Sequence, residues 1–413
     1  MQLEQQILAA QQAMQSGRLE DAARLWSSVL NAVPEHPQAL LHLGQHRLYR
    51  GDPAGALQLL ERAAKADPKN PMVYLNIGSA RRARGDTAGE LAALDRAITV
   101  DPYCFPALLA KGAALDRNAR PRQAARVFRD ALAITPSEEY LPPEIKATVA
   151  RARVVVEQNA KALEALISAR LPSARKEELS PSTSERFEEA VGALVGTKKV
   201  YTQQPSMLHY PRLPAIPFYG REDFPWLSEV EAATDTIREE LRQLLEAQAK
   251  EFRPYLSQPM GAQAEYAPTW NAYFLWKDGN KVEEHCGQCP QTVRVLERLP
   301  LAEVPGFAPT VFFSTLDAKS GIPPHTGATN TRLIVHLPLI VPENCWFRVG
   351  NQRREWRIGE ALIFDDTIEH EAWNDSDRLR VLLIFDIWNP YLSETERQLI
   401  GTLMDAFQEH YQE

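Results

Sequence analysis

A strict 34-residue repeat in the first third of the chain constrains its fold more than any other feature of the sequence. Prolines recur at this interval at Pro34, Pro68, Pro102 and Pro136. Four further columns in the same register hold glycines, large apolar residues and small residues: Gly17, Gly51 and Gly85; Gly44, Gly78 and Gly112; Trp26, Leu60, Leu94 and Phe128; Ala63, Ala97 and Ala131. A period of this length is typical of repeat architectures. Each unit is predicted to be two amphipathic helices, the second of which ends before its proline.

The period and the residue types together resemble a tetratricopeptide repeat array over roughly residues 1–140. The resemblance implies an all-α solenoid whose curved surface is suited to holding an extended peptide. A helical spacer that binds no ligand is the alternative interpretation, and both stay open at this point. The array contains no candidate catalytic cluster, so any chemistry is expected farther along the chain.

The composition is that of an ordinary globular protein. A length of 413 residues suggests two or three domains, and 44% hydrophobic with 24% charged residues excludes wholesale disorder. The net charge of −8 argues against a dedicated nucleic-acid binder and against attraction to anionic lipid. The chain has neither an uncharged run of eighteen apolar residues nor the features of a signal peptide at its start. We therefore expect a cytoplasmic protein without membrane segments, whose four cysteines stay reduced.

Residues 141–200 are predicted to be a helical connector that caps the array and loosens near residues 180–184. A second domain is expected over residues 201–413, with one amphipathic helix at Val230–Phe252 and a helix near the end of the chain. Short segments rich in β-branched and aromatic residues are predicted as strands: 269–276, 309–316, 332–341, 345–349, 354–358, 360–364 and 378–388. Many short strands at such spacing favour a sandwich or jelly roll.

Two histidines and an arginine in the strand-rich region form the strongest candidate for chemistry. His325 is predicted at the entry to a strand, His370 lies just past another, and Arg380 follows ten residues later. The 45 residues between the histidines let the chain cross a jelly roll and return, so both imidazoles could share one metal. A buried arginine needs an anion. This layout is that of a non-haem iron oxygenase whose arginine binds the distal carboxylate of 2-oxoglutarate.

The stretch from about Pro205 to Pro390 resembles the aspartyl/asparaginyl β-hydroxylase family. The resemblance is carried in order by YPRLPAIPFYGREDFPWL, WNAYFLW, CPQTVRVLERLP, HTGATNTRLIVHLPLIVP and RREWRIGEALIFDDTIEHEAWNDSDRLRVLLIFDIWNP. It implies a double-stranded β-helix, or jelly roll, that holds Fe(II) and consumes 2-oxoglutarate and O2. It also implies that the metal ligands fall on His325 and His370, and that the contacts to 2-oxoglutarate fall on Ser314, His336 and Arg380.

Two local features bear on the metal and the substrate. Most such oxygenases carry a carboxylate two residues after the first histidine, but this chain reads His325-Thr326-Gly327, so water is expected at that coordination position. Asp365 and Asp366 are expected to orient a histidine or a bound water rather than to bind the metal.

In the animal members of the family that this chain resembles, the strand after this motif looks to carry two arginines that flank one residue and suit the binding of carboxylates. Here it reads Arg332-Leu333-Ile334 and keeps only the first arginine. Arg332 is therefore a candidate substrate ligand. Trp270 is another candidate for the substrate cleft, although core packing is an equal alternative for its ring.

The segment His285-Cys286-Gly287-Gln288-Cys289 contains a CxxC spacing. Such a spacing can bind zinc or exchange a disulfide. A structural zinc site normally needs four ligands, and the sequence has no second CxxC. A structural role for both thiols is therefore the favoured interpretation.

These observations predict an Fe(II)- and 2-oxoglutarate-dependent dioxygenase that hydroxylates an unactivated carbon. The resemblance points to the β-carbon of Asp, Asn or a related residue in a peptide or protein, which the repeat array would recruit. Two alternatives remain: an oxygenase that acts on a small molecule or a lipid acyl chain, and a repeat scaffold whose second domain only binds.

Overall fold

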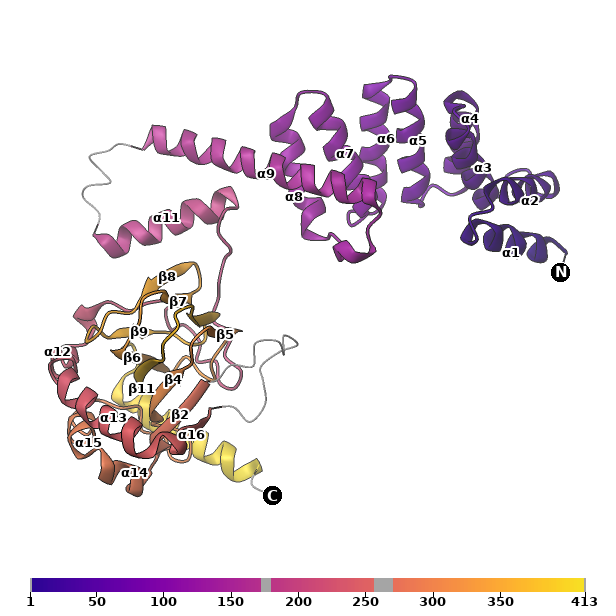
Figure 1. Ribbon diagram of the computed structural model, residues 1–413. Coiled ribbons are helices and arrows are strands. Elements are labelled where there is room, and N and C mark those ends of the chain that lie inside the picture. The colour runs from indigo at the N-terminus through magenta and orange to yellow at the C-terminus, as the bar shows by residue number, and fades with distance from the viewer. Residues whose placement is uncertain (1, 172–179, 256–269, 412–413) are drawn as a thin grey trace. The chain divides into compact units, whose positions relative to one another are not determined.

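The computed structural model describes residues 2–171, 180–255 and 270–411 (Figure 1). The chain divides into two compact units, Met1–Glu177 and Glu178–Glu413. This division falls within the segment predicted to be the connector. The first unit is helical, whereas the second contains all the strands. Each unit has hydrophobic clusters of its own.

The repeat array consists of four helix pairs that follow the 34-residue period. The pairs are α1 (Gln2–Gln15) and α2 (Leu19–Ala32), α3 (Pro37–Tyr49) and α4 (Pro53–Ala66), α5 (Pro71–Ala83) and α6 (Thr87–Val100), and α7 (Phe105–Arg117) and α8 (Pro121–Ala133). Gly17, Gly51 and Gly85 lie in the turns within the first three pairs with positive φ, and Ala119 takes the same conformation in the fourth. The second helices of the pairs all end before the repeat prolines.

The second glycine column lets the two helices of a pair approach closely. Leu60, Leu94 and Phe128 pack where a Cβ atom would stand on Gly44, Gly78 and Gly112. An added Cβ would lie 2.6 Å from Leu60 Cγ in the second pair and 3.2 Å from Leu94 Cγ in the third. In the fourth pair it would overlap the buried Phe128 ring. The glycines are therefore matched to the large apolar column of the same repeat.

Helix α9 (Pro143–Arg170) closes the array, as the sequence predicted. Its Val149 and Val155 share a hydrophobic cluster with Phe128. The expected loosening at residues 180–184 is wrong, because α11 (Pro181–Val195) begins there. Ser180 caps this helix by accepting a hydrogen bond from the Thr183 amide, and proline suits the first helical position.

The second unit is built from two antiparallel sheets. The larger has the order β1-β2-β4-β11-β6-β9, with β3 paired to β2, and the smaller has the order β5-β10-β7-β8. Their bounds are β1 (Arg253–Pro254), β2 (Trp270–Lys277), β3 (Asn280–Lys281), β4 (Val311–Leu316), β5 (Ser320–His325), β6 (Arg332–Ile340), β7 (Cys345–Val349), β8 (Gln352–Glu355), β9 (Leu362–Phe364), β10 (His370–Asn374) and β11 (Arg380–Trp388). Most expected strands are present, but β5 and β10 were not predicted.

The larger sheet is buried on both faces. Because side chains alternate along a strand, Leu383 and Phe385 of β11 face one way, whereas Leu382 and Ile384 face the other. The first pair lies in a core with a layer of helices (Figure 1), and the second lies in a core shared with the smaller sheet. The helices are α12 (Leu227–Ala232), α13 (Thr234–Gln248), α14 (Glu283–Gln288) and α15 (Pro290–Leu296).

Two further helix predictions can be compared with the structure. The single helix expected at Val230–Phe252 is wrong, because α12 ends at Ala232 and α13 starts at Thr234. At this break the Thr234 hydroxyl donates to the Glu231 carbonyl, a local bond that competes with the helical pattern. The helix expected near the end of the chain is present as α16 (Glu394–Tyr411).

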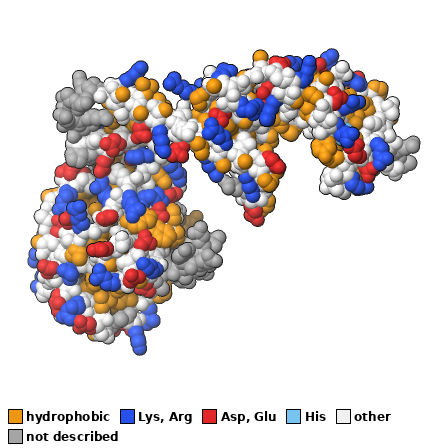
Figure 2. Space-filling model, turned by 45° about the horizontal axis from the view of Figure 1, so that its top comes forward, with side chains coloured by type: hydrophobic (Ala, Val, Ile, Leu, Met, Phe, Trp, Pro, Cys, Tyr) orange, Lys and Arg blue, Asp and Glu red, His pale blue; other side chains and the backbone are white. Residues whose placement is uncertain are grey.

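The surface is mixed in charge. Figure 2 shows basic and acidic side chains intermingled over the face in view, with hydrophobic side chains between them. Within the described ranges, no helix has the length and apolar character needed to cross a bilayer.

The glycine column predicts a graded response to alanine. Alanine gains about 1 kcal/mol of helix propensity over glycine, whereas overpacking costs about 1–3 kcal/mol. Gly78→Ala should therefore be nearly neutral in its effect on stability, because Leu94 needs to shift by only a few tenths of an ångström to admit the new Cβ. Gly112→Ala should destabilise the fourth pair, because its Cβ would overlap Cδ1 of the buried and rigid Phe128 ring. Hydrogen exchange of the whole protein should show faster exchange in α7 and α8 for Gly112→Ala, with α5 and α6 unchanged in Gly78→Ala. Equal protection in the two variants would contradict this packing.

Candidate active site

The two predicted metal ligands face each other across a strand pair. His325 ends β5 and His370 begins β10, and the two residues are direct Cα partners in the antiparallel register. Their ring centroids lie 4.1 Å apart. The sequence placed His325 at the entry to a strand, which is wrong, since it is the last residue of one. The expectation that the chain returns to bring both imidazoles together is confirmed.

Both imidazoles are oriented by backbone carbonyls. His325 Nδ1 lies 2.8 Å from the Pro323 carbonyl oxygen, and His370 Nδ1 lies 3.1 Å from that of Ile368. A hydrogen on each Nδ1 leaves the Nε2 lone pair free for a ligand. Burial lowers the pKa of both rings, that of His370 to about 3, and so favours the neutral form that binds metals. Two nitrogen donors are thus available, and no cluster of three metal-binding side chains occurs within the part of the chain described.

Arg380 is a buried cation without an anion. Its side chain is 1% exposed, and it donates to the Ser314 carbonyl at 3.4 Å and to the Ser314 hydroxyl at 3.3 Å. The guanidinium also lies 5.1 Å from the Trp356 ring centroid, while Nε has no hydrogen-bond partner. Burial lowers its pKa to about 9, which still leaves it charged at neutral pH. Among the described residues none forms an ion pair with Arg380. An anionic ligand in the cavity would provide the counter-charge for this buried cation.

His336 and Trp270 flank this arginine site. His336 is buried against Phe347 and Phe364, its Nδ1 lacks a partner, and burial lowers its pKa well below the usual value. A neutral ring with a free nitrogen suits a hydrogen bond to a ligand. The Trp270 indole donates to the Ser314 hydroxyl at 3.0 Å. Trp270 therefore supports the residue that contacts Arg380, besides lining the cavity.

Arg332 already has a partner inside the protein. It forms an ion pair with Asp386 of β11, and its guanidinium lies 4.8 Å from the Phe307 ring centroid. The second carboxylate oxygen of Asp386 accepts a hydrogen bond from the Thr310 amide at 2.9 Å. Sequence reasoning missed Asp386, although a lone acid within the buried run LLIFDIW must be paired.

Asp366 occupies the space beside Gly327. The Gly327 amide donates to the Asp366 carbonyl at 2.7 Å, and an added Cβ on this glycine would overlap the Asp366 carboxylate. One carboxylate oxygen of Asp366 has no partner, and burial raises its pKa to about 7. Asp365 instead accepts hydrogen bonds from Gln203 and Thr367. Of the two neighbours Asp365 and Asp366, only Asp366 is among the residues that line the cavity.

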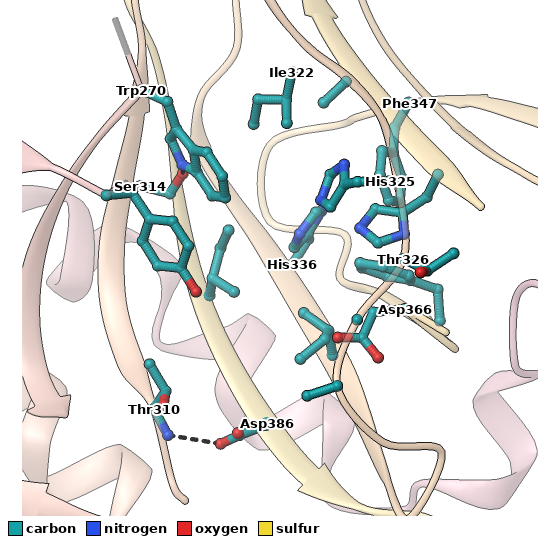
Figure 3. A pocket seen from close by; sticks show the side chains of 18 of the residues that line it. Trp270, Thr310, Ser314, Ile322, His325, Thr326, His336, Phe347, Asp366 and Asp386 are labelled. Atoms are coloured by element: carbon teal, nitrogen blue, oxygen red, sulfur yellow. Dashed lines mark hydrogen bonds between the residues drawn. The ribbon is translucent and has the colours of Figure 1, made fainter. Parts of the chain in front are cut away.

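These side chains line one cavity of about 440 Å³ between the two sheets (Figure 3). It brings together all seven residues that the sequence nominated: Trp270, Ser314, His325, Arg332, His336, His370 and Arg380. Tyr255 joins them, since its ring stacks on Trp270 with 4.1 Å between centroids. Its sequence neighbourhood carries no motif that would have identified it. The cavity therefore combines two neutral nitrogen donors with a buried cation.

The CxxC segment lies in another part of the domain. Cys286 and Cys289 are buried at α14 and α15, in the core beneath the helices. Burial raises the pKa of both thiols, that of Cys289 to about 12. Such thiols are poor nucleophiles, and the interpretation of CxxC as structural fits this environment.

Comparison with known proteins supports the resemblance inferred from sequence. Residues 231–390 match the family model of aspartyl/asparaginyl beta-hydroxylase, and residues 7–71 and 43–105 match that of the tetratricopeptide repeat. The chain thus combines tetratricopeptide repeats with an aspartyl/asparaginyl beta-hydroxylase domain. It is similar over this domain to enzymes named hydroxylases, which supports an enzymatic role.

Two curated relatives illustrate the range of the family. The aspartyl/asparaginyl beta-hydroxylase of Mus musculus is 37% identical over 136 residues, which is 32% of this chain and 18% of that protein. The ornithine lipid ester-linked acyl 2-hydroxylase of Rhizobium tropici is 36% identical over 190 residues, which is 45% of this chain and 65% of that protein. The chain therefore spans less than two thirds of either relative. A solved tetratricopeptide repeat protein of Thermus thermophilus is 24% identical, covers 39% of this chain and 90% of that chain, and has a TM-score of 0.32.

The contact between Gly327 and Asp366 predicts energetic coupling between the two positions. Gly327→Ala should lower the thermal stability, because its Cβ would displace a buried carboxylate. Gly287→Ala is the matched control, since nothing lies within 4 Å of its added Cβ. Adding Asp366→Ala to Gly327→Ala should recover part of the loss, with a coupling of about 0.5–3 kcal/mol as found for residues in contact. Strict additivity in this double-mutant cycle would show that the two side chains do not meet.

Proposed function

We propose that this chain is an Fe(II)- and 2-oxoglutarate-dependent hydroxylase whose second unit is a double-stranded β-helix. The observation that carries the proposal is the pairing of Arg380, a buried cation without an anion, with two neutral histidines in one cavity. A dicarboxylate co-substrate would supply the missing anion at one end and reach the histidine pair with the other. The match of residues 231–390 to a hydroxylase family supports the same reaction class.

Each residue has a defined task in this proposal. His325 and His370 would hold Fe(II) through Nε2, since their Nδ1 atoms face carbonyl oxygens. When bound, Fe(II) with 2-oxoglutarate supplies the O2 activation needed to hydroxylate an unactivated carbon. Arg380 and Ser314 would bind the distal carboxylate, and the free nitrogen of His336 would donate to the co-substrate. Because Gly327 offers no carboxylate, water would complete the coordination that a carboxylate provides in most such oxygenases.

Two substrate classes fit this reaction. The name of the Mus musculus relative supports the side chain of Asp or Asn in a peptide or protein. The name of the Rhizobium tropici relative supports an ester-linked acyl chain. The tetratricopeptide repeats suggest interaction with a protein, which would recruit a protein substrate or a protein that carries the substrate.

Removing either histidine should abolish metal binding. His325→Ala and His370→Ala each delete one of two protein donors, so Fe(II) affinity should fall by more than the roughly 10- to 100-fold typical of losing a ligand's supporting partner. Anaerobic calorimetry with Fe(II) measures this directly. His209→Ala is the control, since His209 is exposed and lies outside the cavity. Normal affinity in either cavity variant would refute the ligand assignment.

Arg380 should set the affinity for 2-oxoglutarate without affecting the metal. Leaving a carboxylate unpaired at a buried site costs about 2–5 kcal/mol, so Arg380→Met should raise the Kd of 2-oxoglutarate at least about tenfold. The Kd of 2-oxoglutarate in Arg380→Lys should lie between those of the unmodified protein and Arg380→Met, because lysine keeps the charge but lacks the planar guanidinium. Arg378→Met is the control, since Arg378 is exposed two residues away. An unchanged Kd in Arg380→Met with normal Fe(II) binding would place the co-substrate elsewhere.

A further inference from the structure

The cavity has two chemically different ends. Arg380 and Asp386 both lie on β11, six residues apart, which corresponds to about 20 Å along a strand. Figure 3 shows Thr310 and Asp386 together in the lower part of the view, apart from Ser314, the contact of Arg380, and from His325 and His336, which all lie above them. If Arg380 binds the co-substrate, the end at Asp386 is left for the substrate.

The only cation at this second end, within the described lining, is already neutralised. Arg332 forms an ion pair with Asp386, and Asp386 is 1% exposed. A substrate carboxylate that took Arg332 would leave the buried Asp386 carboxylate without its partner. Asp366 also lines the cavity, and it adds no positive charge in either protonation state. The substrate end therefore has no free positive charge for an acidic side chain.

Apolar side chains also line this end of the cavity. Ile334 lies two residues after Arg332 on β6, and its Cα partners are Phe364 on β9 and Asp386 on β11. Ile334, Phe364 and Ile384 line the cavity together. An aliphatic group entering here would bury apolar surface without separating any ion pair.

We infer that the substrate end of the cavity selects an uncharged aliphatic segment, that of a fatty acyl chain, rather than a carboxylate-bearing side chain. The inference rests on the proposed function and specifies its substrate. Ile334 and the Arg332–Asp386 pair are its specificity determinants: the ion pair removes the charge that would hold an acid, and Ile334 presents a hydrophobic wall.

The test measures succinate formation by the full-length protein with Fe(II), 2-oxoglutarate and O2. Sucrose monolaurate, used below its micelle concentration, provides a neutral ester-linked acyl chain. Two blocked hexapeptides that differ only in a central Asp or Leu are the alternative substrates, one with a side-chain carboxylate and one with an aliphatic side chain. We expect the laurate ester to raise succinate formation above the rate without substrate and to gain one oxygen by mass spectrometry, while the Asp peptide does neither.

The matched variants are Ile334→Arg and Ile358→Arg. The first places a charge in the cavity wall and should reduce the stimulation by laurate about tenfold or more, because a charge must lose its hydration there. The second makes the same change at a residue that is 46% exposed, outside the cavity, and should leave the stimulation unchanged.

Hydroxylation of the Asp peptide, or of the Leu peptide with the ester unmodified, would overturn the inference. Succinate formation without substrate but with no stimulation by laurate would overturn it while leaving the proposed function intact. Absence of succinate under every condition would overturn both.

Discussion

The burial of the Arg380 guanidinium is the constraint that most determines the character of the cavity in the second unit. Burial of a charge without a counter-charge is unfavourable, and the protein offers Arg380 only neutral partners, the Ser314 oxygens and the Trp356 ring. Pairing of β11 with β4 in the large sheet holds Arg380 in this position, where its side chain is almost fully buried. An anionic ligand would therefore supply the counter-charge that this buried cation lacks.

The histidine pair depends on a different constraint, the register between two strands. β5 and β10 pair so that His325 and His370 are opposite each other. The Nδ1 atom of each ring faces the backbone carbonyl of the residue two positions earlier, which fixes the orientation of the ring. A shift by one residue would turn one ring to the other face of the sheet. The geometry of the histidine pair therefore rests on the local backbone of these two strands.

Sequence reasoning was most successful where one physical requirement repeats. The 34-residue period predicted the helix pairs, because each pair repeats a large apolar residue, and in three of the four pairs a glycine makes room for it. It failed at β5 and β10, since Pro323 and Pro324 argue against a strand and HEAWN is too short and polar to stand out. β5 tolerates its prolines because it lies at the edge of its sheet. The partners of a side chain were also out of reach: nothing local shows that Arg332 meets Asp386, 54 residues later.

One strand accounts for the asymmetry of the cavity. Side chains at even positions of β11, from Arg380 through Leu382 and Ile384 to Asp386, face the space between the sheets. The strand thus presents a cation at its start and an anion near its end, but the sheet neutralises only the anion, through Arg332 on the neighbouring β6. An anionic ligand is consequently favoured at one end and gains nothing at the other. The alternation of side chains along β11 therefore places an unpaired cation at the Arg380 end of the cavity and a neutralised ion pair at the Asp386 end.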